Sequence, residues 1–203
     1  MRMKKIAYLF FVLLAFLTVT DVKAQDAKKI LDKSAAAFTK AGNVKIGFFA
    51  NVNGNNAGGT ICISGNKFQL NTGDLIIWFD GKSMWNYVVV NDEVNVSHPS
   101  AKEVARMNPY SFLTLYKKGY DCSMGKSSST EYEVILKGQK GSAYNRITVR
   151  MSKKSYQPTY IKTEAKSTME IKVNSFASKQ NFPVSTFTFD KKKYPKVEVI
   201  DLR

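Results

Sequence analysis

The sequence predicts a mainly β protein: a single curved antiparallel sheet, with an N-terminal helix and short mid-chain helices packed on one face. Apolar and polar residues alternate over most of the chain after residue 43, as in strands with one buried face. Asp80-Gly81 joins two aromatic-rich runs, which is a strong signal for a β-hairpin. Helical segments within residues 100–116 interrupt this rhythm and need an apolar surface on which to lie.

The N-terminus has the features of a secretory signal peptide. Basic residues precede an apolar run from Ile6 to Val19, and small residues end at Ala24, before the expected cleavage site. The run is short for a membrane span. We therefore expect export with removal of residues 1–24, and a single domain over residues 25–203. The residue directly after the cleavage site is Gln25 and not a cysteine, so no lipid is expected on the mature N-terminus.

The chain is strongly basic, with 31 Lys and Arg against 16 Asp and Glu and a formal net charge of +15. Such a charge favours transient contact with anionic membrane surfaces. The alternative is a charge that only keeps the protein in solution. The lysines are scattered along the expected strands, apart from Lys191-Lys192-Lys193. Because the chain carries an export signal, we expect no nucleic-acid partner.

One amphipathic helix is expected at the start of the mature chain. Asp26 is the expected N-cap, residues 27–40 are rich in good helix formers, and Gly42 is the expected stop. Apolar residues recur at helical spacing along one stripe, with lysines and an aspartate elsewhere. The stripe contains Ile30, Leu31, Ala35 and Phe38.

Two short helices are expected in the middle of the chain. The first, residues 100–107, ends at Asn108 because the following Pro109 disfavours helical geometry there. Pro109 then begins a second helix over residues 110–116. These helices are short enough to cover a sheet, and we expect them to form a lid with the N-terminal helix. The expected lid residues are Ile30, Leu31, Phe38, Met107, Phe112, Leu113 and Leu115.

The expected strands follow from the period of two. They cover residues 44–48, 60–64, 67–70, 75–79, 84–90, 131–137, 146–151, 169–174 and 187–189. In the strand after the hairpin, Trp85 and Tyr87 share one face, and we expect that face to be the apolar side of the sheet. A fully packed barrel or sandwich is the default for such stripes, whereas the wide apolar faces and few short helices favour a ligand cavity.

Catalytic and metal-binding patterns are missing from the sequence. The one histidine, His98, has no second histidine to act with, and no nucleophile elbow is present. Gly81-Lys82-Ser83 matches the end of a phosphate-binding loop, but Ile76 stands where that motif requires glycine, and a strand follows. We expect no enzyme activity, no cofactor and no metal site. Cys62 and Cys122 could form a disulfide or serve as free apolar fillers.

Several segments resemble the periplasmic lipoprotein carrier LolA family of Gram-negative bacteria, in a divergent form. The most specific is Asp80 to Tyr87, Asp-Gly-Lys-Ser-Met-Trp-Asn-Tyr. The end of the first helix, the glycine-led strand Gly58-Gly59-Thr60-Ile61, the helix with Phe112-Leu113 and the segment Phe187-Thr188-Phe189 match as well. The likeness spans the whole mature chain.

This resemblance implies an unclosed half-barrel whose concave face is lined with aromatic residues and capped by helices. Acyl chains of lipoproteins would shelter there while the carrier, a monomer, crosses the periplasm from an inner-membrane release complex to an outer-membrane acceptor. The resemblance implies no enzymatic activity and no cofactor. The expected cavity residues are Phe48, Phe68, Leu70, Trp85, Tyr87, Val134, Leu136, Ile147, Val149, Ile171, Phe187 and Phe189.

One position departs from the family pattern. An Arg-Pro pair that helps to close the lid in the family is replaced here by Ser64-Gly65-Asn66. The lid latch is therefore not carried over. Two other functions stay open: a periplasmic sensor or adaptor that binds lipid or protein without transport, and a polysaccharide-binding or structural surface protein.

Overall fold

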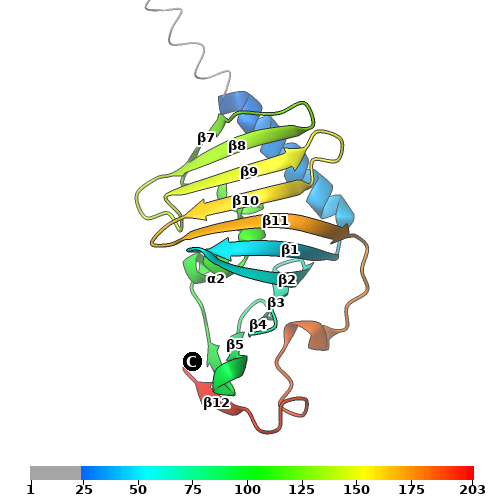
Figure 1. The fold of residues 1–203 in the computed structure, drawn as a ribbon, viewed down its shortest axis with the longest axis vertical. Coiled ribbons are helices and arrows are strands. Elements are labelled where there is room, and N and C mark those ends of the chain that lie inside the picture. The colour runs from blue at the N-terminus through cyan, green and yellow to red at the C-terminus, as the bar shows by residue number, and fades with distance from the viewer. Residues whose placement is uncertain (1–23) are drawn as a thin grey trace, which may run out of the picture.

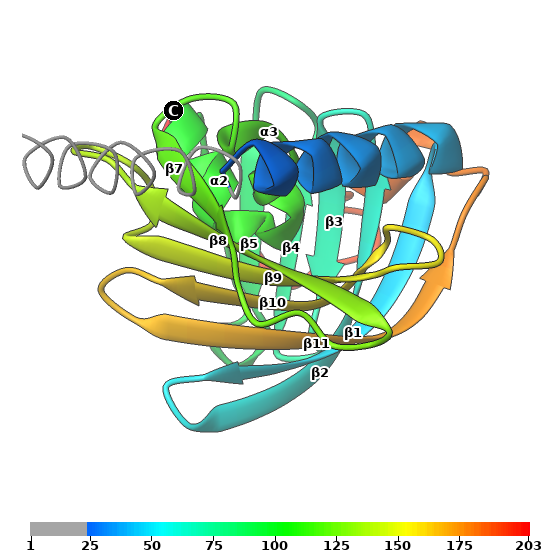
Figure 2. The ribbon, with the colours of Figure 1, turned by 90° about the horizontal axis from the view of Figure 1, so that it is seen from above.

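The computed structural model describes residues 24–203, and the expected signal peptide lies outside these residues except for Ala24. The described chain forms one twelve-stranded sheet that curves around a layer of helices (Figures 1 and 2). Figure 2 shows the N-terminal helix, α2 and α3 together on the concave side of the sheet. No helix in residues 24–203 is long and apolar enough to span a membrane.

The strands in chain order are β1 (Val44–Val52), β2 (Asn55–Ser64), β3 (Lys67–Asn71), β4 (Leu75–Phe79), β5 (Met84–Val88), β6 (Glu93–Ser97), β7 (Tyr120–Met124), β8 (Glu131–Gly138), β9 (Arg146–Ser152), β10 (Pro158–Glu164), β11 (Thr168–Ala177) and β12 (Glu198–Asp201). Their order across the sheet is β12-β6-β5-β4-β3-β2-β1-β11-β10-β9-β8-β7. The sheet ends at β12 and β7, so the barrel is unclosed, as the family resemblance implied.

The C-terminal part departs from the expected strands. The pair β12–β6 is parallel, while the other pairs of the sheet are antiparallel. The strand expected at residues 187–189 is wrong: Val184–Phe187 form a 3₁₀ turn, η3, that follows Pro183. A fixed proline φ favours such a turn over a continuing strand. Val89–Asn91 likewise form a 3₁₀ turn, η1, where extended chain was expected.

The helices lie close to the expected positions. Residues 24–41 form the N-terminal helix, so Asp26 lies inside it and is not its N-cap. Gly42 ends it with a φ of +68°, a conformation that glycine adopts without strain. The mid-chain helices are α2 (Ala101–Met107), the 3₁₀ turn η2 (Pro109–Ser111) and α3 (Phe112–Leu115).

The N-terminus of α2 has a complete capping box. The Ser100 hydroxyl accepts a hydrogen bond from the Glu103 backbone N–H, and the Glu103 carboxylate accepts one from the Ser100 backbone N–H at 2.7 Å. At the C-terminus of α3, Tyr116 is the C-cap residue, and its ring is buried. These local contacts allow a helix of seven residues to form on the open side of the sheet.

Two separate apolar clusters lie on the two faces of the sheet. The larger one fills the concave face, where β1–β5 and β7–β11 meet the helices. The smaller one lies on the outer face of β4, β5 and β6 and is covered by the chain after residue 188. We call these the concave cluster and the outer cluster. The outer cluster contains Ile76, Trp78, Tyr87, Val94, Val96 and Val197, with Trp85, Phe189 and Tyr194 packed against it.

Candidate functional site

The concave cluster brings together eight of the twelve residues expected to line a cavity. They come from both arms of the half-barrel, because alternation along each strand sends every second side chain to this face. The eight are Phe48, Phe68, Leu70, Val134, Leu136, Ile147, Val149 and Ile171.

The other four expected cavity residues lie elsewhere. Trp85, Tyr87 and Phe189 belong to the outer cluster. Phe187 is buried in η3, outside the concave cluster. The register explains the difference: Trp85 pairs with Trp78 and Met84 with Phe79, and it is the Phe79–Met84 pair that faces the concave side.

Six of the seven expected lid residues pack onto the concave cluster. They are Ile30, Leu31, Phe38, Phe112, Leu113 and Leu115. Met107 does not, because it ends α2 with 39% of its surface exposed. Phe112 is completely buried, and with Leu31 and Phe68 it fills much of the space between sheet and helices. The concave side is therefore largely packed under the lid in this structure.

An open volume remains at one mouth of the half-barrel. A cavity of about 570 Å³ lies between the N-terminal helix, the β2–β3 turn and the lid helices. Volumes of this size fall in the range of small-molecule sites. Its lining includes Phe38, Val104, Tyr110, Leu113 and Leu115, with Thr39, Asn66, Asn108, Ser111, Thr114 and Lys117 among its polar members.

Val104 and Tyr110 line the cavity but are not among the site residues expected from the sequence. Both lie within the expected helical segments, and Val104 follows the helical period there. Tyr110 follows Pro109 at the start of η2, where its backbone N–H donates to Asn108 Oδ1 at 2.9 Å. The Tyr110 ring lies against Phe38, with centroids 5.4 Å apart.

Hydrogen bonds to two main-chain carbonyls and one carboxylate hold the lid. The Tyr144 hydroxyl, from the β8–β9 loop, donates to the carbonyl of Ala105 in α2 at 3.0 Å. Arg106 Nε donates to the carbonyl of Ala143 at 3.3 Å. The Tyr116 hydroxyl donates to Asp32 on the N-terminal helix. Burial, followed by this bond, raises the pKa of Tyr116, so its hydroxyl stays protonated and remains a donor.

The position of the family Arg-Pro pair lies at the cavity mouth. Gly65 and Asn66 both line the cavity, and Gly65 has a φ of +60° in the β2–β3 turn. The Asn66 amide lies beside Gly81, so close that a Cβ on Gly81 would meet Asn66 Nδ2 at 2.8 Å. Asn66 therefore lies against the Asp80-Gly81 turn. The bonds that tie α2 to the β8–β9 loop form on another side of the lid.

The two cysteines are free. Cys62 lies on β2 and Cys122 on β7, with β1, β11, β10, β9 and β8 between these strands in the sheet. Burial raises the pKa of both thiols. They act as small apolar fillers, which was one of the two options left open by the sequence.

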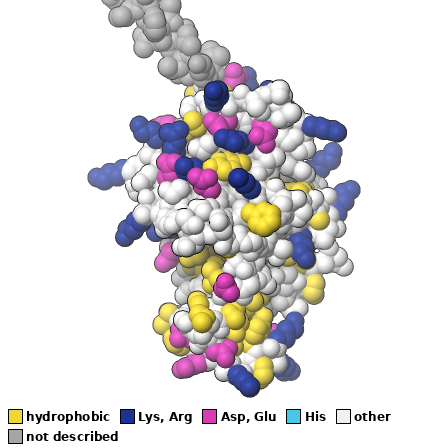
Figure 3. All heavy atoms as spheres, viewed as in Figure 1, with side chains coloured by type: hydrophobic (Ala, Val, Ile, Leu, Met, Phe, Trp, Pro, Cys, Tyr) yellow, Lys and Arg dark blue, Asp and Glu magenta, His cyan; other side chains and the backbone are white. Residues whose placement is uncertain are grey.

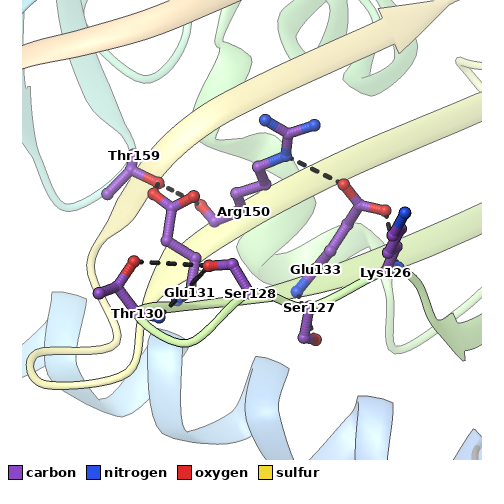
Figure 4. A network of polar contacts seen from close by, with 8 residues as sticks. All are labelled: Lys126, Ser127, Ser128, Thr130, Glu131, Glu133, Arg150 and Thr159. Carbon is purple, nitrogen blue, oxygen red and sulfur yellow. Dashed lines mark hydrogen bonds and ion pairs between the residues drawn. The ribbon is translucent and has the colours of Figure 1, made fainter.

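The outer face of β8–β10 is polar. Arg150 Nε lies 3.0 Å from Glu133 Oε2, and Glu131 accepts a hydrogen bond from the Thr159 hydroxyl at 2.6 Å (Figure 4). Figure 3 shows lysine and arginine side chains spread around this face with acidic side chains between them. Exposed pairs of this kind stabilise little. Within residues 24–203 no group of three or more His, Cys, Asp or Glu could hold a metal ion.

Comparison with known proteins agrees with this architecture. A family model described as outer membrane lipoprotein carrier protein LolA matches residues 17–167. The chain belongs to the LolA family. The match ends before β11, so the segment that covers the outer cluster lies beyond it. No curated protein sequence matches the chain.

Solved structures similar to this LolA family member share little sequence with it. An uncharacterized conserved protein from Thermus thermophilus is 11% identical, with a TM-score of 0.60 over 87% of this chain and 99% of that chain. A LolA superfamily protein from Nitrosomonas europaea is 11% identical, with a TM-score of 0.42 over 80% and 97%. LprF from Mycobacterium bovis is 10% identical, with a TM-score of 0.40 over 79% and 97%. At these identities the likeness concerns the fold alone, and of the three superpositions only the first supports it.

Proposed function

We propose that this LolA family protein is a periplasmic carrier that shelters the acyl chains of lipoproteins and moves them from the inner to the outer membrane. The observation that carries the proposal is the apolar concave face covered by short helices, with a cavity at its mouth. Membership of a family described as lipoprotein carriers supports the same function.

The physical need for such a site is large. An acyl chain in water costs about 0.8 kcal/mol per methylene, so one long chain costs more than about 10 kcal/mol. An apolar concave surface offsets this, provided that the ligand replaces the contacts that the lid makes with the sheet. Phe112 and Leu113 make those contacts now, so we infer that entry of a chain displaces α3 from the sheet.

Release requires that the lid be weakly held. The direct hydrogen bonds between α2 and the β8–β9 loop come from Tyr144, Arg106 and Lys102, and the last of these is exposed. Segments with short helices and few such bonds are the first to open in a folded protein. The proposal includes two partners: an inner-membrane complex that releases the lipoprotein to this protein, and an outer-membrane acceptor that takes it. It also includes transient contact with anionic membranes.

A cavity-filling substitution tests the function. Ala35→Trp places a large ring in the cavity from the N-terminal helix, whereas Val90→Trp adds the same ring at a residue that is 87% exposed and outside the cavity. Acylated proteins that co-purify with the native protein are identified by mass spectrometry. We expect them with the wild type and with Val90→Trp, and a loss of most of them with Ala35→Trp. Equal recovery with both variants would place lipid binding elsewhere.

A sensor or adaptor on the same fold is the second candidate. It would bind acylated ligands in the same cavity without delivering them. Incubation of the loaded protein with acceptor vesicles separates the two functions, because a carrier releases its lipoprotein into the vesicle fraction and a sensor keeps it.

A further inference from the structure

A second, smaller hollow lies beside the cavity, and lysines surround it. Its volume is about 340 Å³, and it lies between α2, the turn after α3 and the β8–β9 loop. Each of these segments contributes one lysine: Lys102 from α2, Lys118 from the turn and Lys140 from the loop. All three lysines are exposed, and no aspartate or glutamate among residues 24–203 lines the hollow. We call this surface the lysine hollow.

Hydrogen bonds hold the three segments of the lysine hollow together. Lys102 Nζ donates to the carbonyl of Gly141 in the β8–β9 loop at 3.2 Å. From the same loop, the Ser142 hydroxyl donates to the carbonyl of Gly119, at the end of the turn after α3, at 2.7 Å. The backbone N–H of Gln139 donates to that carbonyl at 2.9 Å. The fold therefore brings together lysines that are far apart in the sequence.

The positive charge of the lysine hollow is not neutralised by ion pairs. None of the ion pairs found in residues 24–203 involves these three lysines. The acids next to them in the chain, Glu103 and Asp121, accept hydrogen bonds from uncharged groups. On the outer face of β8–β10, by contrast, Arg150 pairs with Glu133. Because like charges repel one another, three lysines held together without acids favour an anionic partner.

The lysine hollow adjoins the cavity of the candidate site. Three residues of α2 and α3 line both of them: Ala101, Ala105 and Leu115. Lys117 is exposed and lines the cavity. Arg106 is also exposed, and it donates to the carbonyl of Ala143, which lines the lysine hollow. Positive charge therefore extends from the lysine hollow to the cavity mouth, along the side of the molecule where the lid lies.

The arrangement of these lysines suits a broad anionic surface better than one small anion. A site for a small anion uses charged or polar donors held in a fixed geometry, whereas the charged side chains that line the lysine hollow are exposed. A lysine is a point charge on a flexible stem, so it adapts to phosphates whose positions vary. The surface of an anionic bilayer presents many such phosphates, and each lysine near it raises the affinity roughly fivefold.

We propose that an anionic phospholipid bilayer docks on the lysine hollow, so that the lid and the cavity mouth face the membrane. This inference rests on the proposed function for its purpose, because a carrier has to bring its cavity to a membrane for loading and delivery. It assigns the contact with anionic membranes to one side of the molecule, where α2 and α3 lie.

The test measures binding of the protein to vesicles by flotation. Vesicles of phosphatidylglycerol and phosphatidylcholine are compared with vesicles of phosphatidylcholine alone. Lys118→Gln/Lys140→Gln removes two charges and leaves the bond from Lys102 to the β8–β9 loop in place. Its affinity for the anionic vesicles should fall about 25-fold, at roughly fivefold for each lysine. Binding of the wild type should weaken as the salt concentration rises, because salt screens exposed charges.

Lys45→Gln/Lys172→Gln is the matched control. Both lysines are exposed, and they lie on β1 and β11, outside the lysine hollow and the cavity. Their replacement changes the net charge by the same amount, yet the affinity for anionic vesicles should fall no more than about twofold. Equal losses in the two double variants would show that net charge alone attracts the membrane, and would overturn the assignment.

Two further outcomes would also overturn the docking proposal. One is a wild type that binds vesicles of phosphatidylcholine alone as tightly as the anionic ones, because the lysines would then contribute nothing. The other is release of the protein from anionic vesicles by inorganic phosphate at constant ionic strength, which would indicate a site for a small anion.

The proposed function fails in a different measurement. Vesicle binding is measured on protein without cargo, so it does not require an occupied cavity. If the protein docks through the lysines but no acylated protein co-purifies with it, the membrane contact stands and the carrier function is overturned. If acylated proteins co-purify while Lys118→Gln/Lys140→Gln binds vesicles like the wild type, the docking proposal alone is overturned.

Discussion

Removal of one hydroxyl should loosen the lid without altering the cavity. Tyr144→Phe deletes the hydrogen bond of 3.0 Å from the β8–β9 loop to the carbonyl of Ala105 in α2. Tyr144 does not line the cavity, so the walls keep their shape. The ring is buried and stays in place, because phenylalanine fills nearly the same volume.

The free-energy cost of Tyr144→Phe depends on whether the Ala105 carbonyl keeps another hydrogen-bond donor. The Ala105 carbonyl also accepts from the Ser111 hydroxyl at 2.9 Å, so it is not left without a partner. The loss is then the net value of one hydrogen bond, about 1 kcal/mol, and not the larger penalty of an unpaired buried carbonyl. If the bond breaks when the lid opens, the open population rises roughly fivefold.

Hydrogen–deuterium exchange measures this population directly. Amides of α2 should exchange about five times faster in Tyr144→Phe under conditions where the rate reports the opening equilibrium. Tyr160→Phe is the control, since Tyr160 lies on the outer face, where the Arg150 guanidinium is 4.9 Å from its ring. Unchanged exchange in α2 combined with faster exchange in the β8–β9 loop would show that the bond holds the loop and not the lid.

Two further predictions concern the two faces of the sheet. Gly59→Ala should destabilise the protein by about 2 kcal/mol, because the added Cβ would meet Asn71 O at 2.6 Å and Phe48 Cζ at 2.8 Å. Gly58→Ala is the control: its Cβ makes contacts no closer than 3.5 Å, so it should be nearly neutral. Equal melting temperatures of the two variants would contradict this. Trp78→Ala should lower the free energy of unfolding by about 3–5 kcal/mol. The affinity of the protein for acylated ligands should not change, because Trp78 lies in the outer cluster. A parallel loss of ligand binding would show that the two faces are coupled.

The prediction of strands was most reliable where one face of the sheet is exposed to solvent. In β8 and β9, charged residues such as Glu133 and Arg150 alternate with Val134 and Val149, so the sequence alone indicates which face is buried. All the cavity residues expected on these two strands lie in the concave cluster. β10 was missed, because Ile161 is the one strongly apolar residue between its threonines and charged residues.

The same argument failed in β4 and β5. Ile76, Ile77, Trp78 and Phe79 are all buried, and such a continuous apolar run has no polar face to orient it. The Asp80-Gly81 turn fixed the pairing of the two strands but not which side of the pair is concave. Large rings at Trp85 and Tyr87 then suggested the wrong side.

What the sequence determined by itself was short-range: the Asp80-Gly81 turn, the approximate position of eight of the twelve strands, and the helix stops at Gly42 and before Pro109. These features depend on residues close together in the chain. The tertiary structure decided what covers each face. The segment after residue 188 returns to the outer face of β4–β6 and buries Trp78 and Tyr87 there. Likewise, only the packing of the lid against the N-terminal helix brings Tyr110 against Phe38 and leaves a cavity beside them. Both outcomes are set by contacts between distant segments, which no local pattern specifies.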